Sequence, residues 1–171
     1  MKRIATVLVL ALGTLLSGCF VSEKPMFTPQ SAVRPLEAGR YGLFEQYGDQ
    51  NKPSEYMEVK LRDDGGYDFI NDKGAATPVS FHAIGGGIHV AQVREKKDAE
   101  KKAFGYALFQ IKGREALVYV LECDKQNRAK LLAFGVEIRG KYECFIDKVA
   151  RPAAFFAGLK RGKTTSRMVR E

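Results

Sequence analysis

Apolar and polar residues alternate along most of the chain after position 39, which is the period of two expected of β-strands with one buried face. Residues 56–62 show the pattern clearly, because Met57, Val59 and Leu61 share one face while charged side chains occupy the other. Glycine-rich segments interrupt the alternation, as turns between antiparallel strands do. The pattern predicts an antiparallel meander of about seven or eight strands.

Two hairpins add detail to this meander. Asp63-Asp64-Gly65 is the signal of a three-residue turn, and such a turn pairs Leu61 with Tyr67 on the apolar face. Residues 103–122 form a second hairpin that is apolar on both faces. Both of its faces should therefore be covered, one by the interior of a barrel and the other by a helix.

The period changes after Cys123, where short helices are expected. Asn127 is a favourable N-cap for a helix that runs through Phe134, and residues 152–160 form an amphipathic pattern with a proline near its start. The fold class is therefore mainly β, with α+β as the alternative. A small barrel and a curved sheet both fit, each with a short C-terminal helix.

The N-terminal residues carry a targeting signal. Two basic residues precede an uncharged, mostly apolar run at 4–16, which is too short to span a bilayer and ends in Leu16-Ser17-Gly18-Cys19. This motif resembles the lipobox of bacterial lipoproteins. The resemblance implies that a signal peptide of residues 1–18 is removed and that Cys19 carries three acyl chains, enough for a stable anchor. Phe20, rather than Asp, follows the cysteine, which in this class implies the outer membrane and a periplasm-facing protein, with the cell surface as the alternative.

The composition fits one globular domain behind this signal. The 171 residues are 45% hydrophobic and 28% charged, which excludes global disorder and a multi-span membrane protein. We expect a lipidated cysteine and a proline-rich tether at residues 19–38. A single β-rich domain should occupy residues 39–160, and residues 161–171 should form a basic disordered tail.

Export determines how the two remaining cysteines are interpreted. The periplasm is oxidising, and Cys123 and Cys144 are the only pair available once Cys19 is lipidated. We therefore expect a disulfide between them. It would close a loop of about 22 residues, worth roughly 3 kcal/mol.

The positive charge is concentrated near the C-terminus. The chain carries 28 Lys and Arg against 20 Asp and Glu, and residues 148–171 hold seven basic side chains against Glu171 alone. We expect this end to be a solubilising tail, with contact to anionic lipid, lipopolysaccharide or cell-wall polymers as the alternative. Nucleic acid is not an expected partner, because the chain is exported. The candidate contact residues are Lys160, Arg161, Lys163, Arg167 and Arg170.

A weak candidate for a metal site lies in the hairpin around Gly85-Gly86-Gly87. If Gly85 and Gly86 form a two-residue turn, His82 and His89 oppose each other across the two strands, and imidazole suits zinc or copper. Two ligands are too few for a tight site, so no metal or other cofactor is expected.

Catalytic motifs are absent from the sequence. It contains no Gly-x-Ser-x-Gly elbow and no phosphate-binding loop, so we expect a protein that acts by binding rather than as an enzyme. Its role would be structural, assembly-related or protective, with an unidentified envelope protein as partner. The alternatives are a membrane-tethered protein inhibitor and a carrier or sensor of a small hydrophobic ligand. The aromatic residues that would either line such a pocket or form the core are Tyr41, Phe44, Tyr47, Tyr56, Tyr67 and Phe69.

Overall fold

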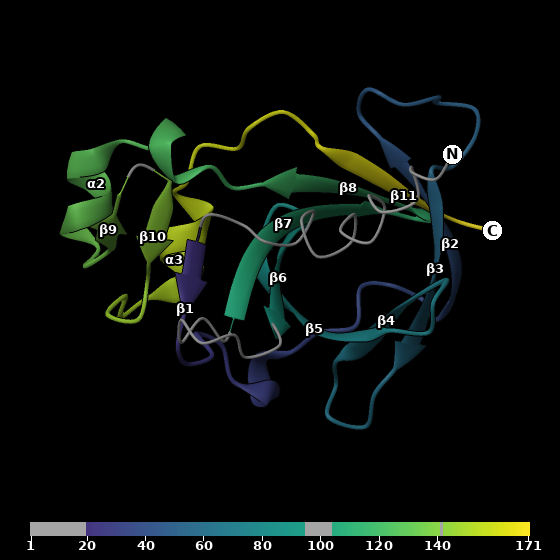
Figure 1. Ribbon diagram of the computed structural model, residues 1–171. Coiled ribbons are helices and arrows are strands. Elements are labelled where there is room, and N and C mark those ends of the chain that lie inside the picture. Colours follow the sequence, from purple (N-terminus) through teal and green to yellow (C-terminus); the bar gives the residue numbers. More distant parts are fainter. Residues whose placement is uncertain (1–19, 95–103, 141) are drawn as a thin grey trace, which may run out of the picture.

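A computed structural model describes residues 20–94, 104–140 and 142–171, and it contains a closed, eight-stranded antiparallel β-barrel (Figure 1). The predicted fold class is thus confirmed, and of its two forms the barrel is the one observed. The signal peptide, Cys19 and the charged loop that follows residue 94 lie outside the described residues. The barrel strands are β2 (Gly39–Glu45), β3 (Glu55–Leu61), β4 (Tyr67–Asn71), β5 (Ala76–Gly85), β6 (Ile88–Arg94), β7 (Phe104–Lys112), β8 (Glu115–Val120) and β11 (Ser166–Arg170).

The barrel is a meander closed by the C-terminal end of the chain. Strands β2 to β8 follow one another in space as in sequence, and β6 also pairs with β7. The chain then leaves the barrel and returns as β11, which pairs antiparallel with β8 on one side and with β2 on the other. Closure through β11 leaves the barrel without unpaired edges.

A smaller layer packs outside the barrel. β1 pairs with β7 at one edge and, in parallel, with β10, which in turn pairs with β9 (Figure 1). We call residues 122–163 the cap. The elements of this outer layer are β1 (Phe20–Ser22), η1 (Pro29–Ser31), η2 (Cys123–Lys125), α2 (Arg128–Ala133), β9 (Glu137–Arg139), β10 (Glu143–Phe145) and α3 (Pro152–Ala157).

Two apolar clusters lie on either side of the barrel wall. The inner cluster contains alternate residues of the barrel strands, with Phe81 and Phe109 in edge-to-face contact at 5.0 Å. The outer cluster joins Tyr106 and Leu108 of β7 to Phe155 and Phe156 of α3. The two-sided character predicted for residues 103–122 is therefore confirmed, because one face lines the barrel and the cap covers the other.

The local predictions hold where the pattern is strong. Leu61 pairs with Tyr67, as the turn at 63–65 predicts. Asn127 caps α2 by accepting a hydrogen bond from the backbone of Lys130 at 3.0 Å. Helix α3 begins at Pro152 and buries its aromatic face.

The predicted tether is wrong for residues 20–36, which pack against the domain. Phe20 is fully buried in β1, and Phe27 and Leu36 are buried further along. The prolines do not expose this segment, because the apolar residues between them are inserted into the two clusters. The chain therefore joins the folded domain at the first residue that the structure describes.

The disordered tail predicted at residues 161–171 is also wrong. Ser166–Arg170 is strand β11, and Met168 is buried in the barrel interior. Arg167 and Arg170 make this stretch of sequence look like an exposed basic tail. Its backbone nevertheless pairs with β2 and β8 and so closes the barrel.

Candidate functional site

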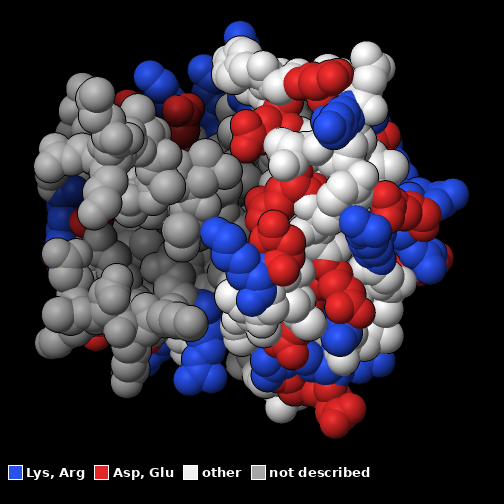
Figure 2. Space-filling model, turned by 45° about the vertical axis from the view of Figure 1, so that its right-hand side comes forward, with Lys and Arg blue, Asp and Glu red and all other residues white. Residues whose placement is uncertain are grey.

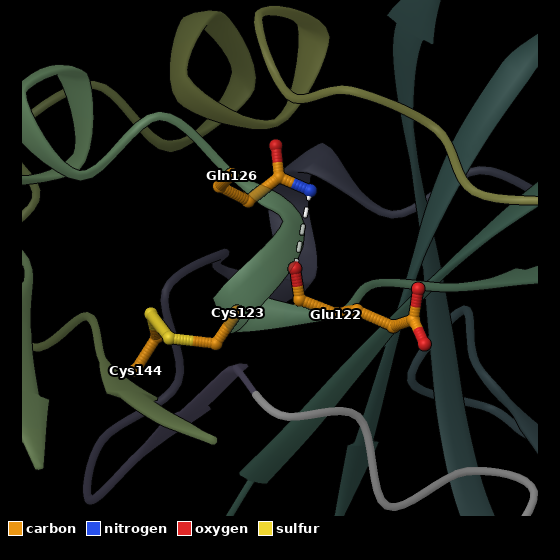
Figure 3. Close-up of a disulfide and its surroundings, with 4 residues drawn as sticks. All are labelled: Glu122, Cys123, Gln126 and Cys144. Atoms are coloured by element: carbon orange, nitrogen blue, oxygen red, sulfur yellow. Dashed lines mark hydrogen bonds between the residues drawn. A yellow bond between two sulfur atoms is a disulfide. The ribbon is translucent and has the colours of Figure 1, made fainter. Parts of the chain in front are cut away.

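The start of the described chain is linked to the cap through the predicted disulfide, which is confirmed. Phe20 pairs with Cys144 in the parallel β1–β10 ladder, and Cys144 is bonded to Cys123 at the start of η2 (Figure 3). The two cysteine α-carbons lie 5.8 Å apart, and both residues are buried. A covalent bond therefore links η2 to β10 in the region next to the predicted anchor.

The same region holds the start of the basic segment 160–163. Gln126, which follows η2, accepts a hydrogen bond from the Lys160 backbone amide at 2.8 Å and donates one to the Lys160 carbonyl at 2.9 Å. Gln126 also donates to the Glu122 carbonyl at 3.3 Å (Figure 3). The backbone at Lys160 is thus fixed beside the disulfide.

The five basic residues predicted to contact polyanions fall into two groups. Lys160, Arg161 and Lys163 are exposed on the segment between α3 and β11. Arg167 instead lies over the Phe44 ring at 4.4 Å and forms an ion pair with Glu115 at 3.7 Å.

Arg170 likewise has an acidic partner, because its guanidinium forms an ion pair with Glu37, which lies two residues before strand β2. The two arginines of β11 therefore contribute to the barrel surface, whereas the three residues of the preceding segment remain exposed.

The positive charge resides in the cap. Residues 122–163 contain ten Lys and Arg against five Asp and Glu, a net charge of +5. Residues 20–94, 104–121 and 164–171 together contain twelve of each. Figure 2 shows basic and acidic side chains interspersed over the part of the described surface that it brings forward. The chain therefore has an electrically neutral barrel and a basic cap.

The predicted opposition of His82 and His89 is wrong. His82 pairs with Val90 and His89 with Ala83, because a bulge next to Gly85 shifts the register by one residue. His82 lies on the outer face of the barrel wall, and His89 follows the inward-facing positions of β6. Within the described part of the chain, no three His, Cys, Asp or Glu side chains are grouped so that they could hold a metal ion.

His82 instead connects residues 20–36, which we call the N-terminal segment, to the barrel. Its Nδ1 lies 3.0 Å from the Ser31 hydroxyl and its Nε2 lies 2.9 Å from the Ser80 hydroxyl, while its ring stacks on Phe27. Only 1% of the residue is exposed. Burial lowers the pKa of His82 to about 4, so the imidazole is neutral at physiological pH.

Buried polar contacts continue from His82 toward β1. Gln92 donates to the Phe27 carbonyl and accepts from its amide, at 3.3 and 3.0 Å. The Tyr106 hydroxyl lies 2.7 Å from that of Ser22 and accepts from the Met26 amide at 3.2 Å. Sequence reasoning missed these residues, because each occurs singly in a strand and its partner lies far away in the chain.

A shallow pocket lies between the N-terminal segment and the barrel. Its volume is about 210 Å³, and it is lined by residues that include Phe27, Pro29, Arg62, Ser80, Gln92 and Arg94. Ligand pockets are usually larger, about 300 to 1,000 Å³. Of the aromatic residues considered for a ligand cavity, Tyr41, Tyr67 and Phe69 pack into the inner cluster of the barrel. Tyr47 is 90% exposed on the surface.

No family model, curated protein or solved structure matches the chain. Among the described residues, no helix has the length and apolar character needed to cross a membrane.

Proposed function

We propose that this protein is a lipoprotein of the outer membrane, anchored through Cys19, which faces the periplasm and acts by binding in a structural, assembly or protective role. The observation that carries the binding role is the packed inner cluster of the barrel. Large side chains such as Phe69, Phe81 and Phe109 occupy the place where a carrier would hold its ligand, which favours contact through the outer surface.

The anchor is supported by the lipobox resemblance and by the chemistry of the remaining cysteines. A disulfide between Cys123 and Cys144 suits an oxidising compartment such as the periplasm. Cys19 is left as the cysteine available for acylation.

The anchor is tested by expressing the full chain and its Cys19→Ser variant with labelled palmitate. We expect label and membrane association only in the parent chain. Label in the variant, or none in the parent, would reject the anchor at Cys19.

A protruding loop favours the membrane-tethered inhibitor as a second candidate. The β2–β3 connection at residues 46–54 carries Tyr47, whose side chain is almost entirely exposed. Aromatic residues presented in this way are frequent contact points in protein interfaces. A photoreactive amino acid at position 47 should then crosslink to one specific envelope enzyme in intact cells, whereas the same group at Leu61, which is also exposed, should not.

A further inference from the structure

We propose that the anchored domain lies with its cap against the membrane, so that Lys160, Arg161 and Lys163 contact anionic lipid headgroups and the β2–β3 loop points away from the bilayer. This inference rests on the proposed anchor at Cys19. It adds an orientation and a specific lipid-contact segment, neither of which follows from lipidation alone.

Very little chain length separates the anchor residue from the folded domain. Consecutive α-carbons are separated by about 3.8 Å, so the anchor residue lies one such step from Phe20. Phe20 is fully buried, pairs with Cys144 and packs edge-to-face on Phe155 at 5.8 Å. A lipid on the preceding residue would therefore hold this side of the domain directly at the bilayer surface.

The basic segment 160–163 lies beside the start of β1. β1 and β8 both use the same edge of β7, with Val21 opposite Gly105 and Val120 opposite Ala107. The start of β1 thus points toward the end of β8. Val21 and Val120 lie opposite residues two positions apart on β7, which corresponds to about 7 Å along that strand. A Cβ atom placed on Gly162 would lie 3.6 Å from the Val120 carbonyl oxygen, so the segment 160–163 passes this junction.

Three basic side chains lie near this junction between β1 and β8. Lys160, Arg161 and Lys163 are exposed, and the carboxylate of Glu122 lies beside this segment, with its Oε2 3.8 Å from the place of a Cβ on Gly162. Asp124 forms an ion pair with Lys125, with 3.8 Å between Oδ2 and Nζ. Glu143 is a further acidic residue at this end of β10. The cap nevertheless keeps a net charge of +5, which favours contact with an anionic headgroup layer.

The position of Tyr142 agrees with the same orientation. Tyr142 directly precedes β10, which runs parallel to β1, so it lies at the end of this strand pair where the anchor joins. It is 54% exposed, and tyrosine is enriched at the interface between lipid and water. Figure 1 places the cap and the β2–β3 side of the barrel at opposite ends of the molecule.

The chain contains no tryptophan, which makes a single introduced tryptophan an unambiguous probe. We suggest Tyr142→Trp and, separately, Tyr47→Trp in the lipidated protein, reconstituted in vesicles that contain brominated lipid. In vesicles with anionic lipid, bromine should quench the tryptophan at position 142 and leave the one at position 47 unaffected. Equal quenching at both positions, or none at position 142, would overturn the proposed orientation.

The role of the basic segment is tested in the same assay. Each positive charge contributes about fivefold to binding at an anionic surface. The triple variant Lys160→Gln/Arg161→Gln/Lys163→Gln should therefore lower the equilibrium constant for the membrane-facing orientation by about two orders of magnitude. Quenching at position 142 should fall accordingly. The matched control removes three charges from the barrel (Lys52→Gln/Lys60→Gln/Lys112→Gln) and should leave quenching unchanged. If both triple variants behaved alike, the segment would have no specific role.

Mass spectrometry of the same samples separates this inference from the anchor itself. If Cys19 carries no acyl chains, the proposed anchor fails and the orientation fails with it. If Cys19 is acylated and the probes give equal quenching, only the orientation is rejected.

Discussion

The Phe27 ring stacks on the imidazole of His82, with ring centroids 4.4 Å apart and planes 12° from parallel. Phe27 belongs to the N-terminal segment and His82 to the barrel wall, so this contact joins two parts of the chain that are 55 residues apart in sequence. The hydroxyl of Ser31 forms a hydrogen bond with Nδ1 at the edge of the same ring. The attachment of the first described residues therefore depends on a histidine that must remain neutral.

Acid should loosen this attachment. The unfolded chain binds a proton at His82 with a pKa near 6.5, whereas burial lowers the pKa in the folded protein to about 4. The contribution of neutral His82 to the free energy of unfolding is fully present above about pH 6.5. It is lost as the pH falls to about 4, and the total loss is about 3 kcal/mol. Urea unfolding followed at several pH values measures this loss.

The variant His82→Gln isolates the histidine from the other groups that titrate in this range, His89 among them, because it lacks only the one imidazole. We expect a free energy of unfolding that falls less steeply with acid than in the parent chain. Identical slopes for the two proteins would show that His82 titrates alike in the folded and unfolded states.

Removal of one hydroxyl should weaken the attachment of residues 20–27 to the barrel. The Tyr106 hydroxyl lies within hydrogen-bond distance of Ser22 and Met26, and both Tyr106 and Ser22 are fully buried. Tyr106→Phe removes the acceptor of the Met26 amide and leaves the Ser22 hydroxyl with its bond to the Lys24 carbonyl alone, which costs about 1 to 3 kcal/mol. Hydrogen exchange should increase at residues 20–27 more than in the barrel, whereas Tyr119→Phe, whose hydroxyl bonds only the Gln110 side chain, should cause a smaller change.

The sequence allowed the barrel strands to be predicted where alternation is strict and the turn is short. Leu61 and Tyr67 pair as expected, because a single three-residue turn leaves one register that buries both. The His82 pairing failed for the converse reason. Gly85, Gly86 and Gly87 all adopt positive φ angles, so the sequence offers several turns, and the bulge that selects one of them is set by contacts with neighbouring strands.

The two ends of the chain were misjudged for a different physical reason. Prolines at positions 25, 29 and 35 and arginines around Met168 are typical of exposed segments, yet Phe20, Phe27 and Met168 are buried. Their burial depends on surfaces formed by distant strands, and no local pattern reports those surfaces. The polar contacts of His82 and Tyr106 could not be predicted for the same reason.

The disulfide should stabilise the domain by constraining the unfolded chain. It links residues 21 positions apart, and closing a loop of that length contributes about 3 kcal/mol. The double variant Cys123→Ala/Cys144→Ala should therefore unfold at a lower urea concentration than the parent. Reductant should lower the midpoint of the parent and leave that of the double variant unchanged, and a parent midpoint insensitive to reductant would contradict the expected contribution.

The last strand should be indispensable to the barrel. β11 supplies backbone partners to β2 and β8, so ending the chain at residue 165 leaves both strands with open edges and removes Met168 from the interior. We expect this truncated chain to lose its cooperative unfolding transition, observed by circular dichroism in urea. Met168→Ala should retain the transition but cost about 2 to 5 kcal/mol, because it leaves a cavity between strands that cannot collapse. Arg167→Gln, on the outer face of the same strand, is the control and should cost less than about 1 kcal/mol, since its ion pair with Glu115 is partly exposed. A truncated chain that unfolds at the parent's midpoint would mean that the seven remaining strands are stable without closure.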